Sequence, residues 1–347
     1  YGVSLLIANV AIAISAVGYG ATFLDANLSP FTTAMWTIAT LWLATVLNFG
    51  GASITGRVSS FTVWGVIGPV FVISTVGWYF FSGHLYMENW NVNNLPFNEA
   101  ATNSIAMTLW AFLGLESAAA NSDAVDNPEK NVPIAVLGGT LGAAVIYVLS
   151  TNIMFGLVPA NDLVNSSAPF GLAFASMFTP TVGKIVMGLM VMSCFGSLLG
   201  WQFTIANVFK QSADEGLFPK LFSKITSKDA PVVGMVTITI IQSLLSLMTM
   251  SESLNAQFEV LVNLAVVTNI IPYLLSMAAI IVILKSAGRG GSELSGTTFI
   301  AFIGSLYSLY ALYASGLEAM TYGSIVTFIG WTLYGFISDK FDLEKQA

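Results

Sequence analysis

A single carboxylate, Glu116, lies inside a long apolar run, TLWAFLGLES at residues 108–117. An ionisable side chain near the middle of a membrane costs roughly 2.5–3.5 kcal/mol on insertion scales and usually faces a cavity or a charged partner. No Lys or Arg lies deep enough in any apolar run to pair with it. We therefore expect its counter-charge to be a proton or a bound cation. The alternative is a protonated Glu116 that is hydrogen-bonded within a helix interface.

Small and aromatic residues near this carboxylate and on a second apolar run favour a substrate cavity. Gly114 is a poor helix former, so we predict a helix break there, whose freed backbone groups need a polar cavity. Trp110 can cover the break as a flat apolar lid. On the second run, Gly196 and Gly200 form a small-xxx-small pair that permits close helix approach. Trp201 follows, and an aromatic wall attracts amines by cation–π contact, although core packing is the simpler interpretation of Trp201 alone.

In a third apolar run, residues 256–285, a proline and several polar residues interrupt the hydrophobic pattern. Pro272 predicts a kink in it. Polar residues on the same run are expected to face the same cavity: Asn263, Thr268, Asn269 and Tyr273.

Two other functional classes need residues that the sequence does not supply. Hydrolysis inside a membrane needs paired carboxylates, a Ser with a base, or a metal cluster, and Glu116 has no companion. One Cys (Cys194) and one His (His84) argue against a disulfide framework and a metal centre. Ion channels commonly repeat pore-lining filters or charged rings, and neither is found. We predict a protein that is not an enzyme, with no catalytic residues, no metal and no cofactor.

Membrane-spanning helices must position these residues. Hydrophobic residues make up 55% of the 347 residues and charged residues only 8%, against about 25% charged in soluble domains. Many segments offer the ~20 apolar residues that cross a bilayer as helix, and their runs are continuous rather than alternating as in a β-barrel. We predict an all-α polytopic membrane protein with a single domain, 1–347, and ten spans: 1–20, 31–49, 61–81, 102–122, 133–157, 182–210, 233–250, 256–285, 298–315 and 318–337.

Basic residues in the connections predict the orientation, because cytoplasmic loops collect Lys and Arg. When the connections are assigned alternately to the two sides, one side holds Lys184 alone. The other holds Arg57, Lys130, Lys210, Lys220, Lys224, Lys228, Lys285, Arg289, Lys340 and Lys345. The C-terminus is therefore predicted to be cytoplasmic and the connection at 25–30 external. A net charge of −7 with acidic external loops favours cationic solutes, or simply reflects solvated loops. No basic patch supports nucleic-acid binding.

Five ordered strings carry a family resemblance: TLWAFLGLESA at 108–118, NPEKNVPIA at 127–135, SLLGWQ at 197–202, SADEGLFPK at 212–220 and NIIPY at 269–273. They resemble the amino acid–polyamine–organocation superfamily and, within it, the bacterial basic amino acid/polyamine antiporters. The resemblance covers essentially the whole chain. It implies an inverted-repeat (LeuT-like) transporter fold of twelve helices, in which two inverted five-helix repeats are followed by two extra helices.

On that template, residue 1 begins the third helix, so ten of the twelve helices are present. Residues 1–81 would complete the first repeat, 102–285 would form the second, and 298–337 would form the two extra helices. We therefore expect a fragment that does not transport by itself, because the first broken helix of the family helps to hold the substrate's α-amino and carboxylate groups.

The resemblance also implies roles for individual residues. Trp110 resembles the family's middle gate, Glu116 its acidic inner gate, and Tyr273 its gating tyrosine. Trp201 resembles a substrate-stacking or gating aromatic, and Asn9, in LIANVAI, matches a substrate-contacting side chain. A sixth position departs from the pattern: arginine–agmatine relatives have a substrate-contacting Ser where this chain has Ala265, which fits a substrate without a guanidinium.

The activity implied by the resemblance is exchange of putrescine for ornithine across a bacterial inner (plasma) membrane, with proton-coupled putrescine uptake as a second mode. Alternatives left open are a cadaverine–lysine antiporter, an arginine–agmatine antiporter and a proton-coupled amino acid symporter. The expected partners are small cationic substrates, protons and the lipid bilayer, and the resemblance allows a homodimer.

Overall fold

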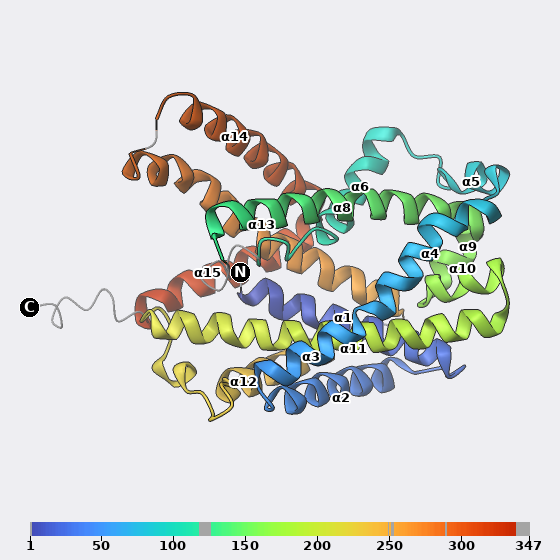
Figure 1. Ribbon diagram of the computed structural model, residues 1–347, viewed down its shortest axis with the longest axis horizontal. Coiled ribbons are helices and arrows are strands. Elements are labelled where there is room, and N and C mark those ends of the chain that lie inside the picture. The colour runs from blue at the N-terminus through green and yellow to red at the C-terminus, as the bar shows by residue number, and fades with distance from the viewer. Residues whose placement is uncertain (1, 118–125, 249, 251–252, 289, 338–347) are drawn as a thin grey trace, which may run out of the picture.

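The computed structural model describes residues 2–117, 126–248, 250, 253–288 and 290–337, which form helices joined by turns and loops (Figure 1). In chain order the helices are α1 (Gly2–Phe23), α2 (Pro30–Asn48), α3 (Ala52–Thr62), α4 (Trp64–Phe80), α5 (Gly83–Asn89), α6 (Phe97–Trp110), α8 (Pro128–Leu157), α9 (Ala160–Asn165), α10 (Pro169–Met177), α11 (Pro180–Asp214), the 3-10 helix η2 (Lys220–Ser223), α12 (Val232–Met248), α13 (Leu254–Ser286), α14 (Gly291–Ala314) and α15 (Gly316–Ile337).

Seven helices in the described part of the chain are long and apolar enough to cross a membrane: α1, α2, α3 with α4, α8, α11, α13 and most of α14. α12 is apolar but shorter, and α6 ends already at Trp110. The predicted all-α architecture is confirmed. Ten spans and the inverted-repeat arrangement of a twelve-helix fold stay predictions.

One predicted span begins later than the helix it describes. We expected a span at 61–81, but helix starts at Ala52, and α4 follows α3 after Val63. The reason is that α3 is rich in small and polar residues. Thr62 and Ser59 of α3 pack against Gly196 and Gly200 of α11, where a Cβ would overlap or crowd them, and the Ser59 hydroxyl donates to the Gly196 carbonyl oxygen at 2.8 Å.

The close approach predicted for the glycine pair on α11 is therefore confirmed. It also explains why hydropathy missed α3, because an apolar pattern cannot report a helix that packs through small polar side chains.

α1 and α11 lie side by side in the middle of the helices (Figure 1). A core cluster joins them to α2, α12 and α13, and residues such as Val10, Leu198 and Val266 in it are fully buried. The start of α11 is fixed locally, because Pro180 occupies its first turn and the Thr179 hydroxyl accepts from the Val182 amide.

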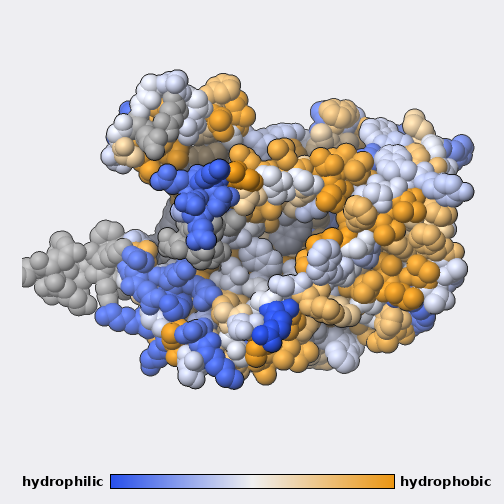
Figure 2. Space-filling view, viewed as in Figure 1, coloured by the Kyte–Doolittle hydropathy of each residue, from blue (hydrophilic) through white to orange (hydrophobic). Residues whose placement is uncertain are grey.

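Large apolar side chains cover the outside of the bundle, and Figure 2 shows them across the middle of one face. α8 is an example: Leu137, Leu141, Val145 and Val148 are each about 60% exposed and follow one another at helical spacing. A soluble monomer rarely leaves so much contiguous apolar surface open to water, whereas a lipid-facing helix is expected to.

The connections gather at two opposite ends of the bundle (Figure 1). At one end an ion pair joins Asp25, after α1, to Lys184 near the start of α11. At the other end the backbone at Gly51 lies so close to Lys228 that no Cβ would fit. This second end carries the basic connection 215–231, in keeping with the predicted charge asymmetry. Of the ten basic residues assigned to the predicted cytoplasmic side, three (Arg289, Lys340 and Lys345) lie outside the described residues. Which end of the bundle faces the cytoplasm stays a prediction.

Candidate functional site

The helix break predicted at Gly114 is present. α6 ends at Trp110, and residues 111–116 form turns. Gly114 has φ +95°, in the left-handed region that L side chains rarely adopt. A Cβ at Gly114 would also meet two ring carbons of Trp201 at 2.7 Å. Backbone conformation and packing thus both require glycine, and the break lies directly against α11.

Glu116 closes the turn that follows the break. Its Oε2 accepts from the Gly114 amide at 2.8 Å, and the Ser117 hydroxyl donates to the Gly114 carbonyl oxygen at 2.6 Å. The other carboxylate oxygen, Oε1, is buried and has no hydrogen-bond partner among the described residues. Glu116 forms no ion pair with any described residue either. The carboxylate therefore keeps one buried lone-pair face for a ligand, a proton or water.

A cavity of about 80 Å³ lies beside the break. One water needs roughly 10–15 Å³, so the space is sufficient for a small organic ligand or several waters. Ten residues line the cavity: Ser4, Leu5, Ala8, Asn9, Ile12, Trp110, Leu113, Gly114, Trp201 and Asn269. The structure thus brings together three of the predicted site residues, Asn9, Trp110 and Trp201.

The other two predicted site residues do not line this cavity. Glu116 lies in the chain between Gly114, which lines this cavity, and Ser117, which lines a second pocket. Tyr273 is half-buried on α13, four residues after the cavity residue Asn269. Their roles, like those of the lining residues, stay predictions.

Two polar side chains of the cavity wall have buried atoms without a partner in the described chain. Asn9 Nδ2 donates to Gln202 Oε1 at 2.6 Å, which leaves Asn9 Oδ1 unpaired. The Ser4 hydroxyl donates to Asn269 Oδ1 at 2.8 Å, which leaves Asn269 Nδ2 unpaired. The wall therefore offers a hydrogen-bond acceptor and a donor. Sequence analysis expected Asn269 here and missed Ser4, although residues 4, 5, 8, 9 and 12 form a single face of α1.

On one side, a pair of aromatic residues separates the cavity from a neighbouring pocket. Trp110 meets Phe258 of α13 edge to face, with ring centroids 6.3 Å apart. Phe258 also lines a neighbouring pocket of about 210 Å³. That pocket shares Ser167 and Asn255 with an outer pocket of about 660 Å³. Phe258 was not predicted, because an aromatic residue in an apolar helix carries no signal of its own.

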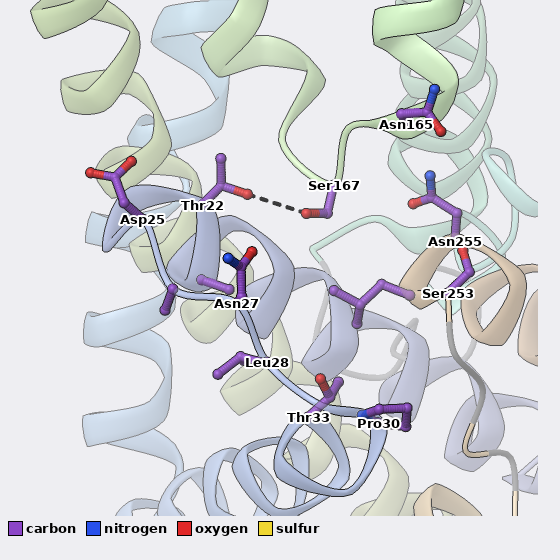
Figure 3. A pocket seen from close by; sticks show the side chains of 13 residues that line it. Thr22, Asp25, Asn27, Leu28, Pro30, Thr33, Asn165, Ser167, Ser253 and Asn255 are labelled. Atoms are coloured by element: carbon purple, nitrogen blue, oxygen red, sulfur yellow. Dashed lines mark hydrogen bonds between the residues drawn. The ribbon is translucent and has the colours of Figure 1, made fainter.

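The outer pocket lies where α1, α2, α9 and α13 meet, and Figure 3 shows its polar side chains. Thr22 and Ser167 are hydrogen-bonded across it at 3.2 Å, and Asn27, Asn165 and Asn255 surround them.

Trp201 forms the boundary on the other side. Its ring lines both the cavity and a pocket of about 350 Å³ beyond it. Five of the ten residues that line that second pocket carry hydroxyl groups: Ser59, Ser117, Ser193, Ser197 and Thr204. The cavity therefore lies between two larger pockets and is separated from each by tryptophan.

Comparisons with known proteins show the family to which the chain belongs. An amino acid permease family model matches residues 1–336. "Putrescine transporter PotE" of Haemophilus influenzae (strain ATCC 51907 / DSM 11121 / KW20 / Rd) is 71% identical over 345 residues, 99% of this chain and 79% of that protein. The protein of the same name from Escherichia coli (strain K12) is 66% identical over 346 residues, 100% of this chain and 79% of that protein. A cadaverine/lysine antiporter of the same strain is 30% identical over 280 residues, 79% of this chain and 63% of the antiporter.

The family resemblance inferred from the five strings is thereby confirmed. With its apolar helices, the chain is a multi-pass membrane protein that belongs to the amino acid permease family.

Proposed function

We propose that this chain forms the transport core of a secondary transporter that exchanges putrescine for ornithine across a bacterial inner membrane, with its C-terminus in the cytoplasm. One observation carries the proposal: a small cavity with tryptophan walls and an unpaired amide oxygen lies between two larger pockets, in a chain 71% identical to a putrescine transporter.

The cavity suits an alkyl chain that ends in an ammonium group. Trp110 and Trp201 cover the methylene groups, and their ring faces attract the cation. Asn9 Oδ1 accepts a hydrogen bond from one ammonium. Glu116 supplies the negative charge that compensates the distal ammonium, since no Lys or Arg of the described chain pairs with it.

Transport then requires each side of the cavity to open in turn. Parting of Trp110 from Phe258 would connect the cavity to the outer pocket, and displacement of Trp201 would connect it to the serine-lined pocket. Tyr273 acts with these aromatic residues as a gate. When Glu116 takes a proton instead of an amine, the same site supports proton-coupled putrescine uptake, which we propose as the second mode.

Counterflow tests the exchange. Proteoliposomes containing the complete transporter are loaded with putrescine, cadaverine or agmatine, and uptake of labelled ornithine, lysine or arginine is measured. We expect saturable ornithine uptake that internal putrescine stimulates most. Lysine uptake driven by cadaverine, or arginine uptake driven by agmatine, would assign the chain to those exchanges instead. Amino acid uptake driven by a proton gradient without internal amine would assign it to symport.

A further inference from the structure

Asn9 belongs to a buried network of neutral amide and hydroxyl groups that links four helices. Gln202 of α11 accepts from Asn9 of α1 and donates through Nε2 to Gln242 Oε1 of α12 at 2.9 Å. The same Nε2 lies 3.1 Å from Thr45 Oγ1 of α2 and 2.8 Å from Thr239 Oγ1 of α12. All five side chains are fully buried. Only Asn9 among them lines the cavity.

The network fixes which way each amide points. Gln242 Nε2 donates to the backbone carbonyl oxygen of Leu6 at 3.2 Å. A carbonyl oxygen cannot donate, so Gln242 must place its NH₂ toward Leu6 and its oxygen toward Gln202. Gln202 must then direct its NH₂ toward Gln242 and its own oxygen toward Asn9. It follows that Asn9 directs its NH₂ toward Gln202 and its oxygen away from the network.

The two threonines support the same orientation. Thr45 Oγ1 donates to the Leu41 carbonyl oxygen at 2.9 Å, and Thr239 Oγ1 donates to the Met235 carbonyl oxygen at 2.8 Å. The two hydroxyls also lie 2.6 Å from each other, so they share their hydrogens between themselves and these carbonyls, and each oxygen keeps a lone pair that can accept. Gln202 Nε2 has two hydrogens: one is directed at Gln242 Oε1 and the other at the two threonine oxygens. A flipped Gln202 would direct its oxygen at the oxygen of Gln242 instead, and an oxygen–oxygen contact in a buried site is unfavourable.

We propose that Gln202 is a positioning residue that, anchored through Gln242 on the Leu6 carbonyl oxygen, holds the Asn9 amide with its oxygen toward the cavity. This wall then accepts a hydrogen bond from a substrate ammonium and disfavours a carboxylate. The inference rests on the proposed function for the identity of the substrate. The inference adds a reason why the neutral Asn9 selects a cation: hydrogen bonding through Gln202 and Gln242 fixes the orientation of the Asn9 amide.

A double-mutant cycle separates this role from a general contribution to packing. Gln202→Met removes the acceptor while keeping a chain of similar length, and Asn9→Ala removes the positioned oxygen. We expect each variant to raise the KM for putrescine about tenfold, equivalent to 1.4 kcal/mol. The double variant should resemble Asn9→Ala within twofold, because Gln202 acts only through Asn9. Gln242→Met should raise KM in the same direction.

Gln257→Met is the matched control. Gln257 is a buried amide of α13 that donates to the Ser246 carbonyl oxygen and does not belong to the network. Its replacement shows what the loss of any buried amide does to protein yield and thermal stability, and it should leave KM within twofold of wild type.

Three results would overturn the inference: a Gln202→Met variant that folds and keeps the wild-type KM, effects of the two substitutions that multiply in the double variant, or an equal rise in KM for Gln257→Met. A wild-type protein that transports another amine but not putrescine refutes the proposed function alone. The double-mutant cycle is then measured with the KM for that amine. A wild-type protein that takes up no amine refutes both.

Discussion

Replacement of Gly114 by alanine is the most direct test of the broken helix. Two costs follow from the structure. A left-handed backbone conformation costs an L residue about 1–2 kcal/mol. The new Cβ would also lie 2.7 Å from two ring carbons of Trp201, well inside the usual carbon–carbon contact of roughly 3.5–4.0 Å. Overpacking of this kind typically costs about 1–3 kcal/mol, so the total is roughly 2–5 kcal/mol.

The two costs should appear in different measurements. Backbone strain lowers the thermal denaturation midpoint, whereas displacement of Trp201 deforms the cavity and raises the KM for putrescine uptake. Two other glycines serve as controls that distinguish the cost of backbone strain from the cost of overpacking. Gly316 has φ +84° but open space around it, and Gly138 on α8 has open space and no positive φ. Gly316→Ala should lower stability without changing KM, and Gly138→Ala should change neither.

Gly114→Ala should change both, with at least a tenfold rise in KM, and shortening Trp201 to leucine in the same protein should recover part of the lost stability. The reasoning is refuted if Gly114→Ala is as stable as Gly138→Ala and transports putrescine with a wild-type KM.

The remaining predictions concern the carboxylate, one gate and one ion pair. Glu116→Gln retains an acceptor for the Gly114 amide but loses the charge, so putrescine exchange in proteoliposomes should fall at least tenfold, and undiminished exchange would remove Glu116 from the site. Trp110 and Phe258 should show a coupling of about 0.5–1.5 kcal/mol in a double-mutant cycle on thermal stability, and additive effects would mean that their edge-to-face contact contributes no stability of its own. Because Asp25 and Lys184 are about half to three-quarters exposed, alanine at either should change stability by less than about 1 kcal/mol, which thermal denaturation at low and high salt can check.

Much of the site could be predicted because polar and aromatic residues are conspicuous in apolar helices. Asn269 interrupts a hydrophobic run, and a buried amide without a ligand or partner is costly, whereas Asn9 was predicted from the family resemblance alone. Gly114 marked the break, since its low helix propensity coincides with a nearby carboxylate. These signals are local to a few residues, so a single sequence contains them.

The rest of the site depends on packing between segments far apart in the chain. Gln202 and Gln242 also interrupt apolar helices, but the side chains that they contact become apparent only where α1, α2, α11 and α12 converge. Phe258 likewise gains a role only through its contact with Trp110. Hydropathy also missed α3, because glycine-to-serine packing replaces the apolar contacts on which the pattern relies.

The continuity of α11 has a mechanical consequence. At 1.5 Å per residue its 35 residues measure about 52 Å, more than the roughly 30 Å of a hydrocarbon layer, so this rod must lean or project from the bilayer. Trp201 and Gln202 are neighbours on it, one touching the break and the other holding Asn9. Because both residues lie on one continuous helix, any change in the tilt of α11 moves the Trp201 ring and the hydrogen-bond partner of Asn9 together.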